Sequence, residues 1–158
     1  MSNRTQENPP FRGNQEVRFA VVIYGGVSLA IYINGIAQEL LQLVRSTATG
    51  KDRKSLRFSD SELRGSAKVY RQLGQLLGCR KPLHEAWEEL NANPSMPVST
   101  RFIIDVLSGT SAGGINAVFL AKALVNNQSL DNLKSMWITE GDIDKLINDR
   151  NSMEPGLT

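Results

Sequence analysis

The sequence predicts an α/β protein, built on a parallel sheet with flanking helices. An apolar run, a glycine-rich turn and a helical pattern follow one another twice, over residues 17–44 and again over residues 101–125. Short runs with few polar residues are typical of parallel strands that are buried on both faces. In such sheets the functional groups collect at the carboxyl ends of the strands, where both glycine turns fall.

The composition supports a globular domain. The chain has 158 residues, of which 41% are hydrophobic and 22% charged, and this balance excludes a disordered or collagen-like chain. The single cysteine, Cys79, permits no intrachain disulfide. Residues 151–158 are a polar stretch with proline and glycine. We therefore expect residues 16–158 to be the incomplete, N-terminal portion of a longer domain.

The N-terminal region divides into an arm, a strand and a helix. Residues 1–15 are polar and contain Pro9-Pro10, so they predict a disordered arm. Residues 17–24 predict the first strand, and residues 28–44 predict a helix. The apolar face expected for that helix carries Leu29, Ile33, Ile36, Leu40 and Leu43.

Residues 19–38 carry no charge, so a signal peptide or membrane helix is an alternative for this segment. Gly25-Gly26 would interrupt its short apolar run, and Asn34 and Gln38 would lie in the lipid core. A strand, a glycine turn and a helix explain these residues better. We expect a cytoplasmic protein, with peripheral contact with an anionic membrane as the open alternative.

Residues 46–100 predict a basic helical insertion between the first two strands, with helices over 61–77 and 84–90. Residues 45–82 carry ten basic and three acidic side chains. Such a block is either a solvated surface or a surface that meets phosphate groups and anionic membranes. It lacks the interleaved aromatic residues of a nucleic-acid site, so no nucleic-acid partner is expected.

The second strand, predicted over residues 101–107, leads into Gly109-Thr110-Ser111-Ala112-Gly113-Gly114 and then a helix over 114–125. This is a G-x-S-x-G nucleophile elbow, in which Gly109 and Gly113 leave room for a sharp strand-to-helix turn. Ser111 is the candidate nucleophile, presented at a helix N-terminus that favours developing negative charge. The alternative is a plain glycine and serine turn. Two further helices are predicted over 129–137 and 142–148.

The first glycine turn offers oxyanion donors. Gly25, Gly26 and Val27 precede a helix, where successive backbone amides form an anion-binding nest, and the Ala112 amide would add a donor from the elbow. A tight turn without a ligand is the alternative. Neither a dinucleotide fingerprint nor a P-loop is present, and no cluster has metal-ligand spacing, so neither a cofactor nor a metal is expected.

The sequence does not supply a catalytic base at the place where an ordinary Ser-His-Asp triad has one. An α/β-hydrolase triad places a histidine after the serine, and none follows Ser111. The single histidine, His84, lies between the two turns and is expected on the surface. Asp105 lies within the second strand and is expected to be structural. Trp87 and Trp137 are expected in the core.

These motifs together resemble the patatin-like phospholipases, in a bacterial patatin-related subgroup. The resemblance covers about residues 17–45 and 101–140 and implies a lipid acyl hydrolase with a Ser–Asp dyad. It makes Ser111 the nucleophile and places Gly25, Gly26 and Val27 in the oxyanion hole. The family's aspartate lies in a downstream Asp-Gly-Gly or Asp-Gly-Ala motif, and no Asp-Gly pair occurs here. The resemblance therefore implies an aspartate outside this chain, and a fragment that is inactive alone.

The chain also departs from the family. Where the family has a third glycine, a small residue, a basic residue and a further glycine, this chain has Val27, Ser28, Leu29 and Ala30. Two other hypotheses stay open: a noncatalytic member that binds lipid or a protein, and a serine acyltransferase or esterase whose histidine lies beyond Thr158. The expected partner is a lipid or another acyl ester substrate.

Overall fold

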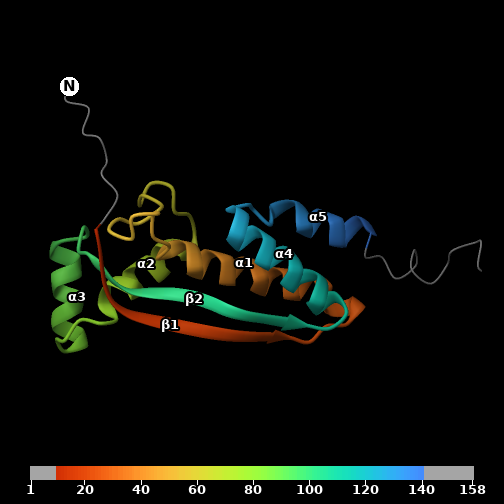
Figure 1. Cartoon of the computed structure of the whole chain (residues 1–158), viewed down its shortest axis with the longest axis horizontal. Helices are drawn as coiled ribbons and strands as arrows, with labels where there is room; N and C mark the ends of the chain where they lie inside the picture. The colour runs from red at the N-terminus through yellow and green to blue at the C-terminus, as the bar shows by residue number, and fades with distance from the viewer. Residues whose placement is uncertain (1–9, 141–158) are drawn as a thin grey trace, which may run out of the picture. The chain divides into compact units, whose positions relative to one another are not determined.

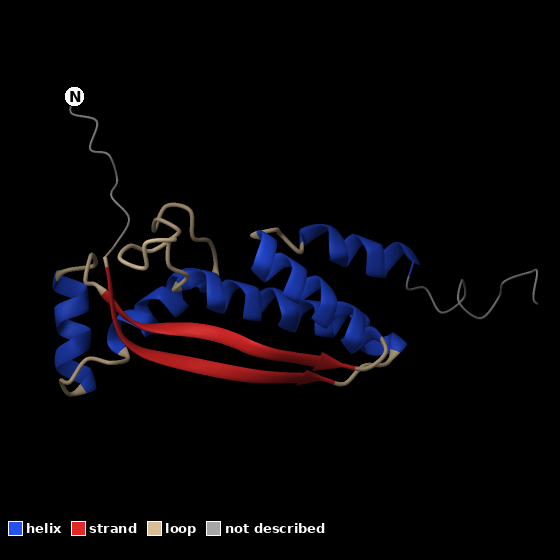
Figure 2. Cartoon of the chain, in the orientation of Figure 1, coloured by secondary structure: helices blue, strands red, loops and turns tan. Residues whose placement is uncertain are grey.

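The computed structural model describes residues 10–140, and its internal contacts divide the chain into two compact units. The first unit comprises the described residues up to Val21 together with Glu39–Val106. The second comprises Val22–Gln38 and the described residues from Leu107 onward. Figure 2 shows helices, strands and connecting loops throughout the described chain, which confirms an α/β protein.

Strands β1 (Phe11–Ile23) and β2 (Val98–Gly109) pair in a two-stranded sheet. Their arrowheads lie at the same end in Figure 1, so the pair is parallel, as predicted. At one end the Val98 amide donates to the Pro10 carbonyl, and at the other the Thr110 amide donates to the Ile23 carbonyl, both at 3.1 Å.

The two strands do not keep one register along their length. Between those two hydrogen bonds β1 advances from Pro10 to Ile23, one residue more than β2 advances from Val98 to Thr110. Gly13 of β1 has a φ of 61°, the left-handed conformation of a G1 bulge, which glycine adopts without strain. No other described residue of β1 has a positive φ.

Several sequence predictions about the strands need correction. Residues 11–15 belong to β1, so the prediction of a disordered arm over 1–15 is wrong for them, and residues 1–9 lie outside the described chain. β2 begins at Val98, inside the segment 46–100 predicted as a helical insertion. The strands are also not buried on both faces, because Val22 is 56% and Val106 52% exposed.

The first unit contains α2 (Ser66–Leu76), α3 (Leu83–Ala92) and the C-terminal part of α1 (Ala30–Ser46). Helix α2 lies tightly against β2, because a β-carbon on Gly74 would lie 3.1 Å from the Thr100 carbonyl oxygen. The Thr47 hydroxyl, just after α1, accepts a hydrogen bond of 2.8 Å from the Phe102 amide. Helices α2 and α3 both lie within residues 46–100, the segment predicted as a helical insertion.

The buried face of α2 is made of small and polar residues, namely Ala67, Arg71, Gly74 and Gln75. Leu73 of the same helix is more than one-third exposed. Gln75 is satisfied there, donating to the Met96 carbonyl at 2.7 Å. The prediction that Trp87 belongs to the core is wrong, since this side chain on α3 is 48% exposed.

The second unit contains the short 3-10 helix η1 (Val27–Leu29), most of α1, α4 (Ala112–Asn126) and α5 (Asp131–Glu140). Its buried apolar residues are Ile23, Ala30, Ile33, Ala37, Ala112, Ala117, Leu120, Ala123, Leu130 and Leu133. The face predicted for the first helix is rotated, because Leu29 and Ile36 are exposed. The helix predicted over 142–148 lies outside the described residues.

Residues 19–38 form the end of β1, a turn, η1 and the start of α1. The prediction of a strand, a turn and a helix for this uncharged segment is therefore confirmed. Among residues 10–140, no helix combines the length and the apolar character needed to cross a membrane.

Candidate active site

Ser111 sits at the turn between β2 and α4. Its φ of 53° and ψ of −132° lie in a region that only glycine adopts easily, so the backbone is strained at this residue. The side chain is exposed and makes no capping hydrogen bond to α4. The strained turn thus presents an uncommitted hydroxyl at the N-terminus of a 15-residue helix.

The neighbouring glycines are needed because the backbone approaches itself closely. A β-carbon on Gly109 would lie 2.6 Å from the Gly113 carbonyl oxygen. One on Gly113 would overlap the Ile23 carbonyl oxygen at the end of β1. Real β-carbons do not come this close to backbone atoms, so both positions accept only glycine.

The first glycine turn lies directly against this elbow. A β-carbon on Gly25 would lie 2.6 Å from the Thr110 carbonyl oxygen and 3.0 Å from the Ala112 nitrogen. The hydrogen bond from the Thr110 amide to the Ile23 carbonyl joins the two chain segments just before their turns. The two turns that the sequence predicted as parts of one site are thus packed together.

Several amides at this junction remain available. Within the described residues, the amides of Gly25, Gly26 and Ala112 donate to no backbone carbonyl. The Gly113 amide is different, because it donates to the Thr110 carbonyl at 2.9 Å and so holds the elbow together. Backbone amides without an acceptor, beside the N-terminus of a helix, are the groups that anion-binding sites use.

A buried polar network that no sequence motif indicated lies behind the elbow. Asn116 is fully buried, and its Nδ2 donates to the Ala112 carbonyl at 2.9 Å and to the Ala30 carbonyl at 3.5 Å. Its Oδ1 accepts from Asn34 Nδ2 and from Trp137 Nε1, each at 3.4 Å. The network therefore connects the first turns of α1 and α4 to α5.

The same network continues along α1. Asn34 is 1% exposed, and its Oδ1 accepts a hydrogen bond of 2.8 Å from Gln38 Nε2. Trp137, expected only as a core residue, acts here as a hydrogen-bond donor. The signal that could have revealed the network is the placement of asparagines within otherwise apolar helical segments, since buried amides require partners.

No base accompanies Ser111 among the described hydrogen bonds. His84 is 76% exposed, as predicted, and its nearest acidic partner is Glu85 at 3.9 Å. Asp105, expected to be structural, pairs with Arg18 of β1 at 3.0 Å. Within the described residues no group of histidine, cysteine, aspartate and glutamate could hold a metal ion.

Large apolar side chains are exposed on the second unit, which carries both turns. They are Val22, Tyr24, Leu29, Ile31, Tyr32, Ile36, Ile115, Val118, Phe119, Val125 and Ile138. Tyr24 directly precedes the first glycine turn and is 78% exposed, and Ile115 lies one helical turn after Ser111. Where exposed apolar side chains lie side by side, they mark surfaces that meet proteins, membranes or apolar ligands.

Comparison with known proteins finds one long match. The chain is 33% identical over 147 residues to the "Uncharacterized membrane protein Rv3479" of Mycobacterium tuberculosis (strain ATCC 25618 / H37Rv). The match covers 90% of this chain and 12% of that protein, so the chain spans a small part of its relative. No protein-family model and no solved structure matches the chain.

Proposed function

We propose that this chain carries the nucleophile and oxyanion turn of a serine lipid acyl hydrolase of the patatin-like kind. The observation that carries the proposal is the strained, exposed Ser111 at an elbow packed against a second glycine turn with available amides. Strain at a serine between a strand and a helix is the geometry that an activated nucleophile needs.

The chemistry is acyl transfer. Ser111 Oγ attacks the ester carbonyl carbon while an aspartate takes its proton, and the amides of Gly25, Gly26, Val27 and Ala112 stabilise the oxyanion. The alcohol leaves with a proton, and water then attacks the acyl-enzyme and releases the fatty acid. The proposal places this aspartate outside the 158 residues of this chain. The chain by itself is therefore expected to be inactive.

An apolar substrate is supported by the exposed side chains beside the turns. Tyr24 and Leu29 flank the glycine turn, and Ile115 follows the nucleophile on α4. An acyl chain could cover these side chains and gain the free energy of removing apolar surface from water. This supports a lipid or another acyl ester as the substrate class.

A noncatalytic protein of the same fold is the second candidate. It is favoured by Val27, which stands where the resembling family has its third glycine, and by the absence of a basic residue at Leu29. In this case the strained serine turn would be a retained structural feature, and the apolar surface would bind lipid or a protein without turnover.

Fluorophosphonate labelling tests the proposal, using the full-length protein in which this chain occurs and reading adducts by intact mass. One adduct that is lost in Ser111→Ala is expected, since the probe reacts only with an activated serine. Ser108→Ala is the matched control, because Ser108 lies in β2 three residues before the candidate nucleophile and should leave the adduct unchanged. No adduct on folded protein would favour the noncatalytic candidate.

A further inference from the structure

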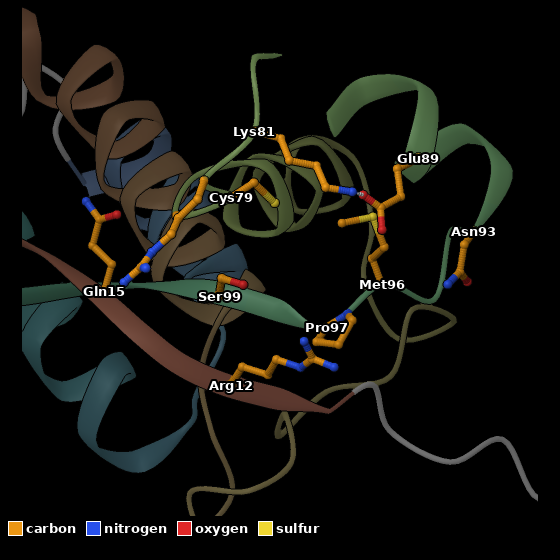
Figure 3. A pocket seen from close by; sticks show the side chains of 11 residues that line it. Arg12, Gln15, Cys79, Lys81, Glu89, Asn93, Met96, Pro97 and Ser99 are labelled. Atoms are coloured by element: carbon orange, nitrogen blue, oxygen red, sulfur yellow. Dashed lines mark hydrogen bonds and ion pairs between the residues drawn. The ribbon is translucent and has the colours of Figure 1, made fainter. Parts of the chain in front are cut away.

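A groove of about 960 Å³ lies in the first unit, and none of its lining residues belongs to the proposed hydrolase site. Figure 3 shows the side chains that line it, which come from different parts of the chain. β1 contributes Arg12 and Gln15, β2 contributes Ser99, and the segment after α2 contributes Arg80 and Lys81. The groove is therefore built by segments that are distant in sequence and not by a single charged loop.

The groove carries an excess of positive charge. Three of its lining residues are cations, Arg12, Arg80 and Lys81, and Glu89 is its single acidic residue. Lys81 Nζ pairs with Glu89 Oε2 at 2.8 Å, and both side chains are about half exposed. Such a pair contributes little, because water screens it. The pair also leaves the two arginines as the dominant charges.

Both arginines are available to a ligand. Among the described residues, the guanidinium groups of Arg12 and Arg80 make no hydrogen bond or ion pair, although Arg18 and Arg101 on the same sheet pair with Glu16. The side chains of Gln15 and Ser99 also have no partner in this part of the chain. Two guanidinium groups and two neutral donors thus face the groove uncommitted.

The end of α2 would repel an anion if its last carbonyls were free, since a helix C-terminus carries partial negative charge. They are not free. The Leu77 carbonyl accepts from Thr100 Oγ1 at 2.7 Å, and the Gln75 carbonyl accepts from Cys79 Sγ at 3.2 Å. The Leu76 carbonyl accepts from the Cys79 amide at 3.2 Å. The helix end is therefore capped before it reaches the groove.

Gly78 shapes the wall between this cap and the strands. Its φ is 86°, and a β-carbon there would lie 3.3 Å from Ser99 Cβ and 3.6 Å from Gln15 Oε1. The left-handed turn lets the chain pass close to both donors and then project Arg80 and Lys81. This close passage places the cationic segment beside the neutral donors of the sheet.

We propose that this groove binds the phosphate group of a phosphorylated ligand. Arg12 and Arg80 bind phosphate oxygens through their guanidinium groups, and Ser99 Oγ and Gln15 Nε2 donate neutral hydrogen bonds. A planar guanidinium fits two phosphate oxygens at once, which favours phosphate over a simple halide. The phosphate is carried by a lipid headgroup or by a soluble phosphate ester, and the two sources are separable by experiment.

Isothermal titration of the whole chain with inorganic pyrophosphate tests the site. The double variant Arg12→Gln/Arg80→Gln should bind pyrophosphate at least about tenfold more weakly. Each substitution removes charge-assisted hydrogen bonds to the phosphate oxygens, and these are stronger than hydrogen bonds between neutral groups. The control Lys51→Gln/Arg64→Gln removes the same charge from exposed residues outside the groove and should change affinity less than about threefold. Circular dichroism establishes that both variants fold.

Three results would overturn the proposal. They are equal weakening in the two double variants, no measurable binding by the unsubstituted chain, and succinate binding as tightly as pyrophosphate. Co-sedimentation with vesicles of phosphatidylcholine and phosphatidic acid then identifies the source. Loss of sedimentation in the groove variant alone indicates a lipid headgroup. Unchanged sedimentation, with pyrophosphate binding lost, indicates a soluble phosphate ester.

Discussion

The backbone of Gly25 lies against the amide nitrogen of Gly113, so closely that a methyl group on Gly25 would overlap it. The two residues are far apart in sequence, one in the first glycine turn and the other in the serine elbow. Their contact depends on the absence of side chains at both positions. It fixes the distance between the proposed oxyanion donors and the proposed nucleophile.

Gly25→Ala should therefore separate the two turns. The added β-carbon meets backbone atoms that cannot rotate away, and overpacking of this kind costs about 1–3 kcal/mol. We expect a lower urea midpoint and, in the full-length protein, a fluorophosphonate adduct that forms at least about tenfold more slowly.

Gly35→Ala is the matched control for this substitution. Gly35 lies within α1, where a β-carbon would meet nothing within 4 Å. Alanine is a better helix former than glycine by about 1 kcal/mol, so this variant should be more stable and should label normally. Equal loss of stability in both variants would contradict the assigned contact.

Ser111→Gly should stabilise the chain relative to Ser111→Ala. Both substitutions remove the hydroxyl, but only glycine relieves a φ of 53° with a ψ of −132°. Relief of such strain contributes about 1–3 kcal/mol, reduced by the greater freedom of glycine in the unfolded chain. Urea unfolding of the two variants measures the difference directly. A less stable glycine variant would mean that the elbow is not strained in solution.

Asn116 and Trp137 should show energetic coupling. Asn116→Ala leaves the Trp137 indole N–H without its buried acceptor and removes the donor to the Ala112 carbonyl, a loss of about 2–4 kcal/mol. Trp137→Phe removes one donor and should cost about 1 kcal/mol. A double-mutant cycle by urea unfolding should give a coupling of at least about 0.5 kcal/mol. Additive effects would show that the two side chains act independently.

The order of elements was predictable because it depends on local patterns. Two strand–turn–helix segments were predicted from the apolar run before each turn and from glycine at positions 25, 109 and 113. The structure contains both segments. The mutual packing of the two turns was expected only from the general rule for parallel sheets. The assignment of Ser111 as a nucleophile stays a prediction.

Burial was harder to predict than order because it depends on what packs against each face. Arg71 was counted only as part of a basic block, yet its side chain is 3% exposed. It donates to the Phe58 carbonyl at 2.8 Å, to Asp60 at 2.7 Å and to the Ser46 carbonyl. Burial lowers the pKa of Arg71, and Asp60 partly opposes this shift. Nothing in the local sequence distinguishes this arginine from the exposed Arg64.

Glu62 should make stability depend on pH in the acidic range. Its Oε2 accepts hydrogen bonds of 2.7 Å from the Ser59 amide and from the Ser59 hydroxyl. Both hydrogen bonds lower the pKa of Glu62 below its usual value, and the bond from the Ser59 amide has the larger effect. The folded chain thus holds this proton less tightly than the unfolded chain. The stabilisation is present above the unfolded pKa, about 4.3, and is lost as pH falls through the folded pKa.

Glu62→Gln isolates this contribution. The variant should have a lower urea midpoint than the unsubstituted chain at about pH 6, and the difference should shrink as the pH approaches about 3. Glu88→Gln is the control, because Glu88 is exposed and has no partner among the described residues, so its midpoint should follow the unsubstituted chain at every pH. A Glu62→Gln difference that stays constant with pH would show that the Ser59 contact does not involve the ionised carboxylate.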